Sequence, residues 1–181
     1  MRKTILTFGL ISGAISAALM STNMLLANKV SYDHGLYLGY TVIVLSMLLV
    51  YFGIRSYRDN VGEGQITFGR AFAVGLGITV ISCLLYVAAW EILYFNFLPG
   101  FMDKYGAHEV QKLTAAGASP AAIQAKVEQF KKYREMYDNP LMNAAMTFIE
   151  PFPVGLLMTL ISSVMLRKKR QGQGVREPAA A

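Results

Sequence analysis

The chain has 181 residues, of which 54% are hydrophobic and only 15% are charged, and its mean hydropathy is +0.40. Soluble domains carry about a quarter charged residues and disperse their apolar residues, so four long apolar runs exclude a soluble globular protein. The net charge of +6 would suit nucleic acid in a soluble protein, but here the cations gather at the ends of the runs. We therefore predict an all-α, polytopic membrane protein that contacts the lipid bilayer and no nucleic acid.

The first apolar run, about residues 5–27, follows Arg2 and Lys3. Its basic start resembles a signal peptide, but the run exceeds the usual 7–15-residue signal core and lacks a clean cleavage site, which favours a retained helix. Small residues recur at every fourth position, on one face: Gly9, Gly13 and Ala17. We interpret this face as a helix-packing surface. The alternative is a polar conduit along Ser12, Ser16 and Ser21.

The second run covers about residues 36–54 and the third about residues 68–97, which predicts two further membrane helices. Small residues again recur at every fourth position of the third run: Gly69, Ala73 and Gly77. Because such stripes let helices approach closely, we expect this one to pack on the stripe of the first helix.

The segment 98–140 is polar and nearly balanced in charge. It predicts a helix over about 107–116 and a second helix that begins with Ser119 as N-cap and Pro120 at its first position. We expect a helical hairpin outside the membrane between the third and fourth spans. It acts either as a lid over a site or as a structural cap.

The fourth run, about residues 141–166, is long enough to cross ~30 Å of hydrocarbon. If each run crosses once, the cations at the run ends all lie on one side: Arg55, Arg58, Arg70, Arg167, Lys168, Lys169 and Arg170. The positive-inside rule then places both termini in the cytoplasm. We expect one four-helix membrane domain over 1–170, in a bacterial inner membrane, and a disordered tail over 171–181.

The sequence holds no hydrolase triad, metalloprotease or nucleotide motif, so we expect no cofactor and no metal. Its best candidates for chemistry are Glu91 and Glu150, because ionisable residues inside spans are costly and usually have partners. Pro151 and Pro153 disrupt the turn beside Glu150 and free backbone carbonyls there. Glu150 then binds a proton, a cation or a basic ligand group, or it simply hydrogen-bonds to neighbours near the membrane interface.

Four segments, in this order and spacing, resemble the bacterial membrane family called domain of unknown function 4199. They are YFGIRSYRD (51–59), ITFGRAF (66–72), MYDNP (136–140) and EPFPVG (150–155). The resemblance covers nearly the whole chain and implies a four-helix bacterial inner-membrane protein. It implies no reaction, substrate or catalytic residue.

The first functional hypothesis is a non-enzymatic scaffold or accessory subunit that acts by helix packing, as a homodimer or within a larger membrane complex. It rests on the two stripes of small residues and on the lack of a catalytic motif. The alternative is a small proton- or cation-coupled transporter that uses Glu150, with Glu91 as a second group. An intramembrane enzyme ranks last, because it would need the two carboxylates to converge with His34 and His108.

Overall fold

The computed structural model describes residues 1–26 and 32–168, with side chains for 1–24 and 37–168. Over these residues the chain is helical, and its extended backbone is limited to one isolated bridge. The helices are α1 (Arg2–Leu26), α2 (Tyr32–Asn60), α3 (Phe68–Asn96), α4 (Phe101–Ala115), α5 (Pro120–Tyr137), α6 (Pro140–Ile149) and α7 (Pro151–Leu166). Four segments are long and apolar enough to cross a membrane: Arg2–Met24, Tyr37–Asn60, Phe68–Asn96 and Pro140–Leu166. The predicted class, an all-α protein with four membrane-spanning segments, is confirmed.

Three of the differences between the helices and the predicted runs have a clear local cause. α2 continues to Asn60, beyond the apolar run, where Asp59 pairs with Arg58 at 2.7 Å and with Arg55 at 3.6 Å. α4 begins at Phe101, six residues before the predicted start, directly after Gly100 with its positive φ of 68°. The fourth run is divided into α6 and α7 at Glu150. Apolar runs mark the hydrocarbon crossing, whereas helices extend beyond it or break within it.

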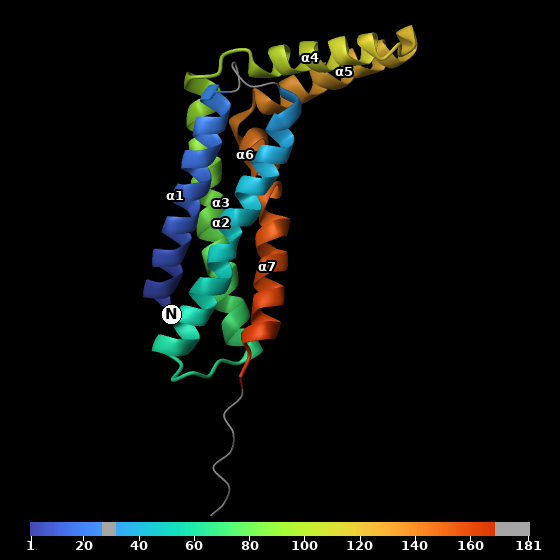
Figure 1. The fold of residues 1–181 in the computed structure, drawn as a ribbon. Coiled ribbons are helices and arrows are strands. Elements are labelled where there is room, and N and C mark those ends of the chain that lie inside the picture. Colours follow the sequence, from blue (N-terminus) through green and yellow to red (C-terminus); the bar gives the residue numbers. More distant parts are fainter. Residues whose placement is uncertain (27–31, 169–181) are drawn as a thin grey trace, which may run out of the picture.

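The spans α1, α2, α3 and α6–α7 stand side by side (Figure 1). α3 packs against α1, α2 and α7, and α2 also packs against α1 and α7. The N-terminus, the α2–α3 connection and the end of α7 lie at one end of the bundle, which we call the basic end (Figure 1). α4 and α5 cover the opposite end, which we call the hairpin end, and project sideways past α6 and α7.

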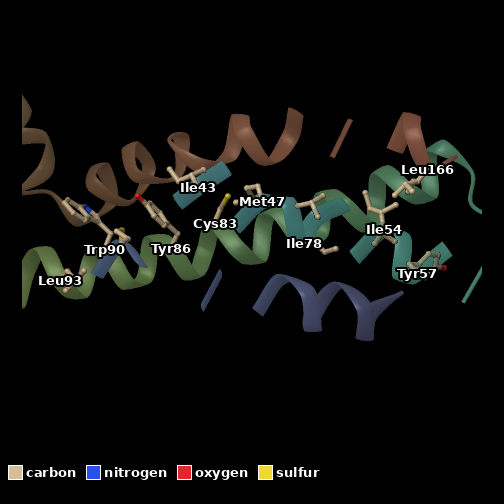
Figure 2. Close-up of a cluster of buried hydrophobic side chains, with 14 of the residues drawn as sticks. Ile43, Met47, Ile54, Tyr57, Ile78, Cys83, Tyr86, Trp90, Leu93 and Leu166 are labelled. Carbon is tan, nitrogen blue, oxygen red and sulfur yellow. The ribbon is translucent and has the colours of Figure 1, made fainter. Parts of the chain in front are cut away.

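The hydrophobic core follows α3 (Figure 2). Ile78 and Cys83 of α3 are fully buried, and α2 contributes Met47, Val50 and Ile54 at 1% exposure or less. Large apolar side chains on the outer faces are exposed instead, as expected for helices that meet lipid. The core of this bundle therefore lies mainly between α3, α2 and α7.

α1 and α3 pack through glycines. A Cβ at Gly9 would lie 2.8 Å from Ile81, one at Gly13 would lie 2.6 Å from Leu85, and one at Gly77 would lie 2.9 Å from Ile5. These contacts place α1 and α3 in parallel at close range, as the stripe on the first helix predicts. Ala17, the last residue of that stripe, is half-buried.

The predicted stripe on the third helix does not pack as a unit. Gly69 has open space around it and Ala73 is exposed, so only Gly77 meets α1. The reason is the register of the two helices: residues 5, 9 and 13 of α1 lie against 77, 81 and 85 of α3, so position 73 falls at the start of α1 and position 69 lies beyond that helix. The expectation that all three residues face the first helix was wrong for Gly69 and Ala73.

A second set of small residues, which was not predicted from the sequence, brings α3 and α7 together. A Cβ at Gly75 would lie 2.8 Å from Thr159, and a Cβ at Gly155 would overlap Thr79. The Thr79 hydroxyl lies 3.2 Å from the Gly155 carbonyl oxygen, to which it donates, and 3.2 Å from the Thr159 hydroxyl. A glycine of each helix therefore packs against a threonine of the other. The signal was present as two Gly-x-x-x-Thr repeats in apolar runs.

Candidate functional site

The break in the fourth span is built by Pro151, which has no N–H and whose ring displaces the preceding turn. The Glu150 N–H reaches only the Thr147 carbonyl oxygen, at 3.4 Å. Pro151 is buried, whereas Glu150 is exposed on the outer surface of the bundle. At 1.5 Å per residue, Glu150 lies ~15 Å below the start of α6 and ~24 Å above the end of α7. It is the only charged residue between positions 140 and 166, and it lies within the span.

The carboxylate of Glu150 has one oxygen near a buried side chain of the bundle, although the residue is exposed. Its Oε2 lies 3.5 Å from the hydroxyl of Tyr86, a long distance for a hydrogen bond. Tyr86 is only 7% exposed and comes from α3. One carboxylate oxygen is thus directed at the bundle, while the residue itself stays accessible from outside.

Glu91 lies on a different side of α3 from Tyr86, the residue that contacts Glu150. It follows Tyr86 by five residues on α3, which separates their directions by about 140° around the helix axis. Its Oε1 is buried and has no hydrogen-bond partner among the described residues. The structure therefore does not bring Glu91 and Glu150 together. The hypothesis of a converging acidic pair has no geometric support.

A buried asparagine beside this break joins three helices. Asn143 of α6 is fully buried, and its Oδ1 accepts from the Trp90 indole N–H at 2.8 Å and from the Thr147 hydroxyl at 3.2 Å. Its Nδ2 donates to the Tyr137 carbonyl oxygen at the end of α5, at 3.0 Å. Asn143 thus fixes the hairpin to α3 and α6. Asn143 was not among the residues predicted from the sequence, although an amide in an apolar run is a recognisable signal.

Serine hydroxyls in the core connect helices but form no conduit. Ser82 donates to the Ser12 hydroxyl at 3.0 Å, and Ser12 donates to the Ser46 carbonyl oxygen at 2.8 Å, which links α3, α1 and α2. Ser16 and Ser21 instead donate to carbonyl oxygens of their own helix, those of Gly13 and Ala17. The hydroxyls of Ser12, Ser16 and Ser21 therefore do not form one hydrogen-bonded line.

The cations expected to orient the protein gather at the basic end. Arg55 and Arg58 pair with Asp59, and the exposed residues of the group are Arg55, Arg70, Arg167 and Lys168. Lys169 and Arg170 lie outside the described residues, as does the predicted tail over 171–181. The described members of this group, which flank the spans, therefore share one end of the bundle with the N-terminus (Figure 1).

A cleft of about 200 Å³ lies at the base of the hairpin. Arg134 stands at its edge and pairs with Asp103 at 3.0 Å and with Asp138 at 3.7 Å. The pair with Asp103 links α5 to α4, whereas the pair with Asp138 lies within the last turn of α5 and its C-cap. Within residues 1–26 and 32–168 no three His, Cys, Asp or Glu side chains converge in a metal-binding group.

Packed apolar spans, helix-to-helix hydrogen bonds and a broken fourth span define this chain as a multi-pass α-helical membrane protein. Residues 7–168 match the family described as Protein of unknown function (DUF4199), and the chain belongs to that family. None of the curated proteins and none of the solved structures matches it. Its function must therefore be inferred from the arrangement of its residues.

Proposed function

We propose that this protein is a non-enzymatic subunit of a membrane assembly, a scaffold or accessory protein that binds its partner inside the bilayer. The observation that carries the proposal is the position of Glu150, exposed on the outer face of the bundle within a span. An ionised side chain in hydrocarbon costs about 3 kcal/mol or more. A partner that covers Glu150 removes this cost, and the same cost makes the pairing specific.

The packing of the bundle supports an assembly role over a transport role. Alternating access needs helix groups that move against each other around a central site. Here Gly75 and Gly155 hold α3 and α7 at a distance that admits no Cβ, and Thr79 hydrogen-bonds across the same contact. Gly9 and Gly13 hold α1 on α3 in the same way. Such a bundle provides a fixed outer surface for a partner.

We further propose that the basic end faces the cytoplasm of a bacterial inner membrane and that α4 and α5 lie outside. Support comes from the described cations at that end, because clustered Lys and Arg beside spans mark the cytoplasmic side. The family match over residues 7–168 supports one continuous membrane domain, which we place at 1–170.

A proton- or cation-coupled transporter is the second candidate. It is favoured by the contact between Glu150 and Tyr86 next to a proline break, since a carboxylate beside disrupted backbone can bind a proton or a cation. This function predicts a proton flux in proteoliposomes that Glu150→Gln abolishes. The assembly function predicts no such flux.

The first experiment is to extract the protein, expressed at its native level, in polymer nanodiscs and to measure the protein mass per particle. For the wild type we expect more than the 19.9 kDa of one chain. Glu150→Gln should release a single, folded chain, because a neutral amide needs no charged partner. Glu91→Gln is the matched control and should keep the wild-type mass. A wild-type particle that holds one chain alone contradicts the proposal.

A further inference from the structure

The charge of the chain itself restricts what can cover Glu150. No Lys or Arg occurs at positions 5–28, 30–54, 71–103 or 135–166, so every span is free of cations at the depth of Glu150. A second copy of the chain, placed symmetrically over this surface, would bring only another Glu150. Two like charges in a medium of low dielectric constant repel strongly.

We propose that Glu150 is the docking point for a transmembrane helix of a different protein that carries one Lys or Arg at the matching depth, ~15 Å from the hairpin end. This inference rests on the proposed assembly function and names the class of partner. A cation at that position supplies the N–H donors that the outward side of the carboxylate lacks. Charge-assisted hydrogen bonds of this kind are short, and they are stronger away from water.

The hairpin and the fourth span meet at an angle at the hairpin end. α4 and α5 project past α6 and α7 at the hairpin end, above the flank of the bundle that the fourth span forms (Figure 1). α4 alone has 15 residues, or ~22 Å, about twice the diameter of a helix with its side chains. The first turn of α4 packs on α3 through Phe101, and the later part of the hairpin extends beyond the fourth span (Figure 1), where a further helix along α6 and α7 would end beneath it.

The hairpin is held in that position from one side only. Its base is fixed to the bundle by the Asn143 bond to Tyr137 and by the contact of Phe101 with Trp90, whose ring centroids lie 5.5 Å apart. α5 has no buried residue along its whole length. The unburied surface of α5 is therefore available to the end of a partner helix that lies along the fourth span.

The test uses full-length protein in liposomes and three synthetic transmembrane peptides of leucine and alanine, labelled for energy transfer. One peptide carries a single Lys ~15 Å from the end that inserts on the hairpin side, one carries Leu there, and one carries the Lys two turns deeper. We expect the first peptide to associate at least tenfold more tightly than the other two. Glu150→Gln should abolish that difference, and Glu91→Gln should preserve it.

Two results overturn the inference. The first is an equal association of the Lys and Leu peptides with the wild type. The second is a wild-type homodimer, formed without peptide, that Glu150→Gln dissociates. The second result would leave the assembly function intact and reject only the heterologous basic partner. Single-chain nanodisc particles together with equal peptide binding would reject both proposals.

Discussion

The two halves of the fourth span are held to α3 in opposite ways. Below the break, α7 packs closely on α3 because each helix has a glycine at the contact. Gly155 lies against Thr79, and Gly75 lies against Thr159. Above the break, α6 reaches α3 through a polar side chain, Asn143, which accepts from Trp90 and Thr147. Between the two halves lies Glu150, which neither mode of packing covers.

This difference shows how one span can carry both a rigid anchor and a binding surface. Close backbone contact depends on shape and tolerates no added volume. A buried amide depends on complete hydrogen bonding and tolerates no lost partner. The proline break lets the two halves take separate directions and leaves one carboxylate at their junction. Substitutions in the two halves should therefore destabilise the protein for different reasons.

The largest effect is expected below the break. Gly155→Leu should lower the free energy of unfolding by about 3 kcal/mol or more, because its Cβ overlaps Thr79, a stiff β-branched side chain, and lies 3.1 Å from Met47 Sδ. The measurement is reversible unfolding in mixed micelles. Gly69→Leu is the matched control, since nothing lies near that glycine, and should change the free energy by less than about 0.5 kcal/mol. Equal losses for both variants would contradict the proposed α3–α7 contact.

A smaller effect is expected above the break. Asn143→Leu should cost about 2 kcal/mol, because it leaves the Trp90 indole N–H without an acceptor in an apolar environment. The tryptophan fluorescence should shift as well, since Trp90 is the only tryptophan in the chain. Asn96→Leu removes an exposed amide that bonds only to its own helix, and it should have little effect. An unchanged emission spectrum in Asn143→Leu would argue against the Trp90–Asn143 bond.

The last effect is confined to alkali and concerns the hairpin base. Burial, and next the charge of Glu150, raises the pKa of Tyr137 to about 12 from its ordinary value of 10.0. The folded protein therefore binds the phenolic proton more tightly than the unfolded chain. This contribution is fully present below pH ~10 and is lost as the pH rises towards ~12. Unfolding of Tyr137→Phe should show a shallower fall over that interval than the wild type. Identical slopes would show that Tyr137 is solvated.

The sequence predicts the four spans, the Ser119–Pro120 start of α5 and the gathering of cations at one end, because each of these depends on local composition. It identifies Glu150 and its proline break from the cost of a charge in an apolar run. It does not reveal that Glu91 faces away from Glu150, or that Gly75 rather than Gly69 meets a neighbouring helix. Those facts depend on how each helix is rotated and on the register between neighbouring helices, and an error of one position changes the direction of a side chain by about 100°.

The short bridge at the basic end links two distant parts of the chain. Ile66 and Lys168 exchange both of their backbone hydrogen bonds, at 3.1 and 3.0 Å, and the Ile66 side chain is buried. Residue 168 leaves the ribosome ~5 to 20 s after residue 66 at ordinary rates of synthesis. During that interval the backbone of Ile66 lacks its final partner. The basic end of the bundle therefore closes late in biogenesis, and insertion of the fourth span is the step that completes it.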